Sequence, residues 1–120
     1  MVFTKLFGTK SEREVKKLNP TLEKINQMYE TLSSKSDEDL ALRTKELREF
    51  VINTREDKAS SLPENMDRKE REDQILKAEQ GALGLIMVEA FAIVKDTCRR
   101  MCGTSWRVSG QEISWEMIPY

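Results

Sequence analysis

The amino-acid sequence predicts a mainly α-helical protein with three long helices and a short β-hairpin or extended tail at its C-terminal end. Only 5 of the 120 residues are glycine and 3 are proline, whereas charged residues make up 34% of the chain. This composition favours long helices, because glycine and proline are the residues that interrupt helices most strongly. We expect the helices at about residues 11–34, 37–58 and 64–102, and the hairpin or tail at about 104–118.

The first helix is predicted by the clearest periodicity in the chain. Its apolar residues advance by 3, 4, 3, 4 and 3 positions, which is the spacing of a stripe that packs along a whole helix. The stripe consists of Val15, Leu18, Leu22, Ile25, Tyr29 and Leu32. A proline inside a helix costs about 3 kcal/mol, and Pro20 lies within this stretch. The sequence therefore predicts a kink there, or a restart with Asn19 as the N-cap.

The second helix is predicted by its start signal. Ser36 is followed by three acidic residues, 37–39, which suit the unpaired amides and the positive dipole end of a helix. Residues 59–63, which end in Pro63, are expected to break this helix near position 58. The unbroken charged run at 67–73 mixes both signs, and this pattern predicts a solvated helix.

The third helix is expected to be the most buried, because apolar residues surround much of positions 75–101. Gly81 and Gly84 would weaken its middle, so they predict close packing against a neighbour. Gly103 is expected to end the helix. Beyond it, apolar and polar residues alternate around Ser109–Gly110, which is typical of a hairpin.

The composition excludes several kinds of chemistry. The chain has no histidine, so histidine-dependent triads and histidine-ligated metals are excluded. Cys98 and Cys102 are the only cysteines, which leaves no thiolate metal site or disulfide framework and fits a reducing, cytosolic setting. A net charge of −1 argues against a dedicated nucleic-acid binder. No glycine lies in a loop that could hold a phosphate.

The N-terminal segment, residues 1–10, is short, basic and amphipathic. Phe3, Leu6 and Phe7 fall at i, i+3 and i+4, with lysines at positions 5 and 10. The segment is therefore either a membrane-surface anchor or a chain end whose apolar residues dock loosely on the body. It lacks the apolar core and cleavage site of a secretion signal. The most apolar run, 82–94, is too short to cross a bilayer.

Three separated strings stand out in order along the chain: Lys5-Leu6-Phe7-Gly8, Ser36-Asp37-Glu38-Asp39-Leu40 and Glu89-Ala90-Phe91-Ala92-Ile93-Val94. Together they resemble the start of the SecA family of bacterial preprotein translocase motors. In that family, the last string leads to D-V-Q and then to a Walker-type phosphate loop. Met117-Ile118-Pro119-Tyr120 matches the residues just before D-V-Q. The chain departs from the family in its longer polar stretch at 53–74, and in Val88, where a proline often stands.

The resemblance implies a part of an ATP-driven motor that moves preproteins through the SecY channel. It divides the chain into a basic segment (1–10), a helical region (11–103) and a tail (104–120) that leads into a missing nucleotide-binding domain. Met117 and Tyr120 would line the adenine pocket, while the residues that hold the phosphates and magnesium are absent. This chain alone is therefore expected to bind no cofactor and to hydrolyse nothing. The resemblance also implies a cytoplasmic protein associated peripherally with the inner membrane.

The same resemblance implies contacts of the basic N-terminal part with acidic phospholipids, the SecY channel and a second copy of the motor. The residues concerned are Phe3, Lys5, Leu6, Phe7, Lys10, Arg13, Lys16 and Lys17. Solubility alone is an equally good explanation of the lysines. The alternative to a motor segment is a free-standing helical dimerisation or adaptor module, without ATP chemistry, that pairs through the stripe of the first helix.

Overall fold

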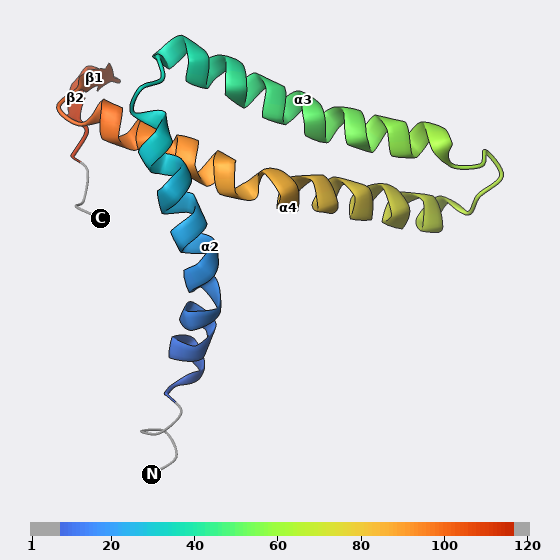
Figure 1. The fold of residues 1–120 in the computed structure, drawn as a ribbon. Helices are drawn as coiled ribbons and strands as arrows, with labels where there is room; N and C mark the ends of the chain where they lie inside the picture. Colours follow the sequence, from blue (N-terminus) through green and yellow to red (C-terminus); the bar gives the residue numbers. More distant parts are fainter. Residues whose placement is uncertain (1–7, 117–120) are drawn as a thin grey trace.

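The computed structural model describes residues 8–116, which form three helices followed by a two-stranded antiparallel hairpin. The elements are α2 (Lys10–Leu32), α3 (Asp37–Ser61), α4 (Arg68–Met101), β1 (Ser105–Val108) and β2 (Gln111–Ser114). Helices α3 and α4 run antiparallel as a long arm, and α2 crosses α4 at the base of this arm and extends away from it (Figure 1). The predicted fold class is confirmed.

Helices α2 and α3 each begin at a reciprocal cap. The hydroxyl of Ser36 accepts from the N–H of Asp39 at 3.0 Å, and the Asp39 carboxylate accepts from the N–H of Ser36 at 3.1 Å. These hydrogen bonds satisfy amides that have no partner inside the helix, and they hold the pKa of Asp39 below its ordinary value. Thr9 and Glu12 cap α2 in the same way. The predicted start of α3 is confirmed.

The turn between α3 and α4 lies later in the chain than predicted. Helix α3 runs to Ser61 instead of ending near 58, and α4 begins at Arg68 instead of near 64. The guanidinium of Arg71 bridges the two helices at this end, where it donates to the carbonyl oxygens of Ala59, Leu62 and Pro63. Carbonyls at a helix end need such partners. The extra turn of α3 is stabilised by an arginine from the charged run.

Pro20 does not interrupt α2, so the predicted restart at Asn19 is wrong. The helix is continuous from Lys10 to Leu32 with the proline inside it. Pro20 leaves the carbonyl of Lys16 without its helical donor. Both residues are exposed and lie on the side of the helix away from the apolar stripe, so water can reach the carbonyl.

The apolar stripe of α2 packs only along its C-terminal half, which corrects the expectation that it packs throughout. Leu32 is buried, and Ile25 and Tyr29 pack against the core. In contrast, Val15, Leu18 and Leu22 are 60%, 63% and 53% exposed. The N-terminal half of α2 therefore stands clear of the other helices (Figure 1).

Helix α4 supplies much of the core, although its two glycines do not mark close packing. Ala92 and Ile93 are buried with Leu40 and Leu47 of α3 in one cluster. Gly81 and Gly84 have no atom within 4 Å of the position that a Cβ would occupy. The prediction of a close neighbour at these glycines is therefore wrong for the part of the chain that the structure describes.

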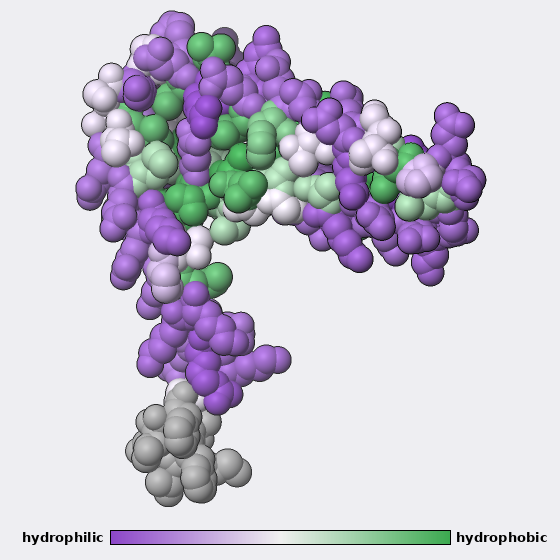
Figure 2. All heavy atoms as spheres, turned by 45° about the vertical axis from the view of Figure 1, so that its right-hand side comes forward, coloured by the Kyte–Doolittle hydropathy of each residue, from purple (hydrophilic) through white to green (hydrophobic). Residues whose placement is uncertain are grey.

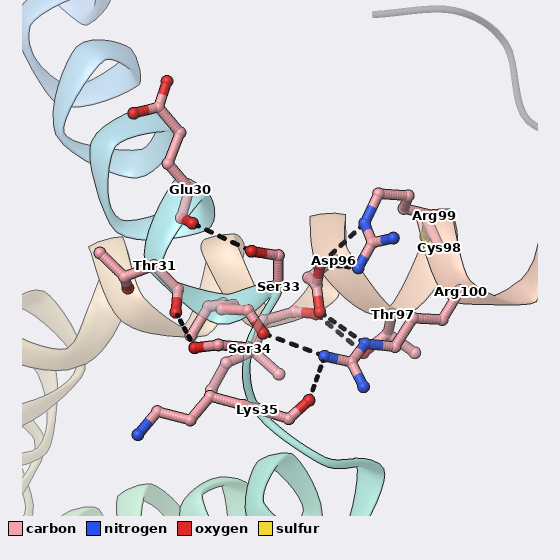
Figure 3. Close-up of polar contacts among 12 residues, drawn as sticks. Glu30, Thr31, Ser33, Ser34, Lys35, Asp96, Thr97, Cys98, Arg99 and Arg100 are labelled. Atoms are coloured by element: carbon pink, nitrogen blue, oxygen red, sulfur yellow. Dashed lines mark hydrogen bonds and ion pairs between the residues drawn. The ribbon is translucent and has the colours of Figure 1, made fainter.

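A buried carboxylate of α4 holds two arginines of the same helix at the base of the arm. Asp96 of α4 is fully buried. Its two oxygens accept hydrogen bonds from Arg99 at 2.7 and 3.0 Å and from Arg100 at 2.7 Å (Figure 3). Burial opposes the charged form, but the bonds from the two arginines outweigh it and hold the pKa of Asp96 below its ordinary value.

Arg100 extends this contact to the other two helices. Its Nη2 donates to the carbonyl of Leu32, the last residue of α2, at 3.0 Å and to that of Lys35 at 2.6 Å. Figure 3 shows the bond to Lys35. Its Nη1 donates to Asp37, the first residue of α3, at 2.7 Å. One guanidinium thereby fixes the end of α2 and the start of α3 against α4. We call Asp96, Arg99, Arg100 and Asp37 the junction cluster.

The C-terminal part forms the predicted hairpin. Ser105 pairs with Ser114, and Val108 pairs with Gln111. The two turn residues, Ser109 and Gly110, have φ values of 50° and 80°, which is the left-handed geometry of the tight turn that suits twisted strands. Gly103 (φ 79°) ends α4 as predicted.

Removing the Asp96 carboxylate should loosen all three helices. We expect Asp96→Ala to lower the free energy of unfolding by about 2–3 kcal/mol, because charged hydrogen bonds in a buried site are lost. Urea unfolding followed by circular dichroism measures this. Glu14→Ala is the control, since it removes only an exposed ion pair with Lys17 and should change little. Equal effects of the two variants would contradict the role of Asp96.

The same carboxylate should give stability a pH dependence. Because its pKa is lower in the folded chain than in the unfolded chain, its stabilisation is complete above about pH 4 and is lost as the pH falls through the folded value. In Asp96→Asn this loss should be absent. Unfolding free energies measured at several acidic pH values, for this variant and the unchanged chain, test the difference.

The glycines offer a matched pair of substitutions. Gly84→Ala should raise the free energy of unfolding by about 0.5–1 kcal/mol, because alanine favours a helix and open space surrounds the site. Gly103→Ala should lower it, because φ at Gly103 is positive. Thermal unfolding compares the two, and a loss of stability in Gly84→Ala would show that an unseen neighbour fills this space.

Candidate functional site

The N-terminal half of α2, residues 10–22, carries four of the basic residues that the sequence singled out. We call this part the free half of α2. Lys10, Arg13, Lys16 and Lys17 are all exposed, and the helical spacing sets Arg13 and Lys16 opposite the apolar stripe, with Lys10 and Lys17 at its flank. Lys17 also pairs with Glu14 at 2.9 Å. Four of the eight predicted contact residues thus lie together on one projecting helix. The other four, Phe3, Lys5, Leu6 and Phe7, lie outside the described residues.

An apolar groove lies in the corner between the free half of α2 and α4. Its volume is about 470 Å³. Apolar side chains gather at this corner between α2 and the arm (Figure 2). The lining residues are Val15, Leu18, Asn19, Thr21, Leu22 and Ile25 from α2, with Met87 and Phe91 from α4. We call this the α2–α4 groove.

A second apolar groove, of about 480 Å³, runs between α3 and α4 along the arm. Leu47 and Ile93 form its floor, since both are buried. Ile52, Leu83 and Val94 stand at its edge and are exposed. This groove, the α3–α4 groove, is an unpartnered surface of the kind that binds another helix or chain.

The string Glu89-Ala90-Phe91-Ala92-Ile93-Val94 lies between both grooves. Ala92 and Ile93 point into the core, whereas Phe91 lines the α2–α4 groove and Val94 lines the α3–α4 groove. Phe91 and Val94 are each 59% exposed. Consecutive residues of one helical turn thus serve the core and two separate surfaces.

Glu89 makes an ion pair that the sequence analysis missed. Arg43 of α3 donates from Nε and Nη2 to its two carboxylate oxygens at 2.6 and 3.0 Å. These bonds lower the pKa of Glu89 and raise that of Arg43. The two residues lie on different helices and are 46 positions apart in the sequence, so no local spacing signals the pair. The Asp96 pairs at i+3 and i+4 could have been found from spacing.

The shifted carboxyl groups among the described residues share one direction. The carboxyl groups with shifted pKa values, Asp39, Glu89 and Asp96, are all shifted downward. They stay ionised and are unsuited to donate a proton near neutral pH. Among residues 8–116, no helix is both long and apolar enough to span a bilayer.

The predicted adenine-pocket residues, Met117 and Tyr120, lie outside the described residues. The hairpin leads directly to them. Its last described residues include Trp115, whose ring lies 6.0 Å from that of Trp106 across the two strands. The backbone N–H of Trp115 also donates to the carbonyl of Thr104 at 3.0 Å, which closes the base of the hairpin.

The comparisons with known proteins agree on one family. The model of the SecA DEAD-like domain matches residues 3–113. The protein translocase subunit SecA of Prosthecochloris aestuarii (strain DSM 271 / SK 413) is 35% identical over 137 aligned residues, which cover 99% of this chain and 13% of that protein. The SecA subunit of Chlorobium phaeobacteroides (strain BS1) is 34% identical, with the same shares covered.

A further relative comes from another organism. The SecA subunit of Salinibacter ruber (strain DSM 13855 / M31) is 32% identical over 153 aligned residues, which cover 96% of this chain and 13% of that protein. No solved structure matches the chain. The chain thus spans about an eighth of the length of these curated relatives. Since the family match extends over nearly all of its residues, the chain belongs to the SecA family of protein translocase subunits.

Proposed function

We propose that this chain forms the N-terminal helical segment of an ATP-driven motor that moves preproteins through the SecY channel. Its role in the motor is to make contacts, to an acidic membrane surface and to the channel, while the chemistry resides in residues that it does not contain. The observation that carries this proposal is the free half of α2, which projects from the body with basic residues on one side and apolar residues on the other.

A membrane contact follows from the charges of this region. Lys10, Arg13, Lys16 and Lys17 are exposed, with Glu12 and Glu14 as the acids between them, so the stretch has a net positive charge. Each basic residue near an anionic membrane contributes about 1 kcal/mol of attraction. The apolar residues Phe3, Leu6 and Phe7 supply a second anchoring signal just before the helix, and stable attachment usually needs two such signals. The chain would then act in the cytoplasm, at the inner membrane.

Vesicle flotation tests the membrane contact. Changing Lys10, Arg13, Lys16 and Lys17 to glutamine should weaken binding to vesicles with anionic lipids at least about tenfold at low salt. Binding of the unchanged chain should itself fall at higher salt, because screening weakens the attraction. Neutral vesicles should bind little in either case.

The control removes the same charge elsewhere. Changing four exposed basic residues outside α2, namely Lys45, Arg48, Arg55 and Lys69, to glutamine should leave anionic-vesicle binding nearly unchanged. Equal losses in the two variants would mean that only net charge matters. That result would remove the support for a contact at α2.

The C-terminal tail is proposed to reach the edge of the adenine pocket through Met117 and Tyr120. The support for this comes from the match to the residues before D-V-Q and from the hairpin, which anchors the chain just ahead of these positions. ATP and magnesium would be held mainly by residues of the longer motor. No step of hydrolysis is assigned to this chain.

A second copy of the chain is a further proposed partner, through the α3–α4 groove. Ten residues line this groove, whereas a stable interface uses about 20–30 residues on each side. The self-association should therefore be weak and should grow with protein concentration. The rival interpretation, a free-standing dimerisation module, would instead pair through the stripe of α2.

Light scattering over a concentration series separates these two interpretations. Leu83→Lys at the edge of the α3–α4 groove should shift the chain toward monomer. Leu85→Lys, which is more exposed and does not line the groove, should not. If Leu18→Lys abolishes association and Leu83→Lys leaves it intact, the dimerisation module is correct.

A further inference from the structure

We propose that Cys98 and Cys102 form a reversible disulfide that displaces the hairpin at the end of α4. The bond is made by exchange with a small oxidised thiol of the glutathione class, and the reduced form of the same molecule breaks it. This inference goes beyond the proposed function, because it needs neither a membrane nor a second copy. The two side chains are the only thiols of the chain, and we call them the cysteine pair.

The two thiols are neighbours at the end of α4. They are four positions apart, so their Cα atoms lie about 6 Å from each other, which is within the range found in disulfides. The Sγ of Cys102 is directed back along the helix, where it donates to the carbonyl of Cys98 at 3.6 Å. Cys102 is exposed and Cys98 is half-buried. A small molecule in solution therefore reaches Cys102 first.

The disulfide forms in two exchange steps. The thiolate of Cys102 attacks one sulfur of the small disulfide, so that a mixed disulfide forms and one small thiol leaves. The thiolate of Cys98 then attacks the Sγ of Cys102, and the second small thiol leaves. The cysteine pair is oxidised and the small disulfide is reduced to two thiols. These thiols take up the two protons that the cysteines lose.

The bond strains the last turn of the helix. Side chains four positions apart on a regular helix have Cβ atoms about 5–6 Å apart, whereas a disulfide needs about 3.5–4.5 Å. The end of α4 therefore has to close by about 1–2 Å before the sulfur atoms can bond. A strained disulfide is reduced more easily than a relaxed one. The pair thus stays reduced in a reducing setting and bonds when the pool of small thiols becomes oxidised.

The end of α4 is held weakly enough to move in this way. The N–H of Cys102 donates to the carbonyl of Arg99 at 3.3 Å, which is long for such a hydrogen bond. Gly103 follows, and among residues 8–116 nothing beyond its chain neighbours lies within 4 Å of the position that a Cβ would occupy. Glycine in open space changes its backbone angles at little cost.

A movement at Gly103 carries the hairpin with it. Strand β1 begins two residues later, at Ser105, and the hairpin lies beyond the end of α4 (Figure 1). The N–H of Trp115 donates to the carbonyl of Thr104 at 3.0 Å, so β2 follows β1. In the proposed function this hairpin leads to the edge of the adenine pocket. The bond would then regulate that edge, and this last consequence alone rests on the proposed function.

Oxidation in glutathione buffers tests the bond itself. The chain is incubated in mixtures of reduced and oxidised glutathione, and mass spectrometry under non-reducing conditions reads the product. We expect a monomer that has lost two hydrogen atoms. The control is Cys98→Ser combined with Thr97→Cys, an exposed position whose Cα lies about 8–9 Å from that of Cys102, beyond the reach of a disulfide. Its yield of closed disulfide should be lower by at least about tenfold.

Three results would overturn the proposal at this stage. The first is an equal yield from the cysteine pair and the control pair, because proximity along the chain would then explain both. The second is a cysteine pair that stops at mixed disulfides with glutathione. The third is a disulfide that links two chains, which mass spectrometry separates from the monomer.

Amide hydrogen exchange tests the displacement of the hairpin. The N–H groups of Cys102 and Thr104 donate to carbonyls at the end of α4, so closing the disulfide should make them exchange about threefold faster or more. The control is Cys98→Ser with glutathione bound to Cys102, which should exchange like the reduced chain. A closed disulfide with unchanged exchange would overturn the displacement. Neither measurement uses vesicles or nucleotide, so failure of the proposed function leaves both results unchanged.

Discussion

The fold of this chain depends on one buried carboxylate, Asp96, and on the guanidinium of Arg100 that it orients. Arg100 donates to the carbonyls of Leu32 and Lys35, at the end of α2, and to the first residue of α3 at the same time. The apolar core around Ala92 and Ile93 is small, with only six buried hydrophobic residues in the described part. With so little apolar burial, a charged contact with good geometry at the crossing has a large share in fixing the helices relative to one another.

The beginnings of α2 and α3 were easier to predict than the packing of the helices. Caps such as Ser36 with Asp39 are local, so the sequence predicts them directly. The periodicity of α2 identifies which side of the helix is apolar. It does not say how far a neighbour covers that side, and Val15 and Leu18 remain exposed for this reason. The turn at the arm tip was misplaced because Arg71 acts across helices.

The candidate surfaces, too, could be predicted from the sequence only in part. The basic residues of α2 and the string at 89–94 were visible in the sequence, as was the amphipathic start at Phe3, Leu6 and Phe7. The two grooves were not, because each is formed by residues from two helices far apart in the chain. The same holds for the pair of Arg43 and Glu89, which only the antiparallel packing of α3 and α4 brings together.

Because α2 is attached to the other helices at one end only, a small tilt at the crossing moves its other end by a large distance. The helix is held from about Ile25 onward, and Lys10 lies about 22 Å from this pivot. A tilt of about 10° at the crossing would therefore sweep Lys10 through about 4 Å, roughly the width of a side chain. The direction in which the positive end of the molecule points is thus set in part at the opposite end of α2, where the guanidinium of Arg100 donates to the carbonyls of Leu32 and Lys35.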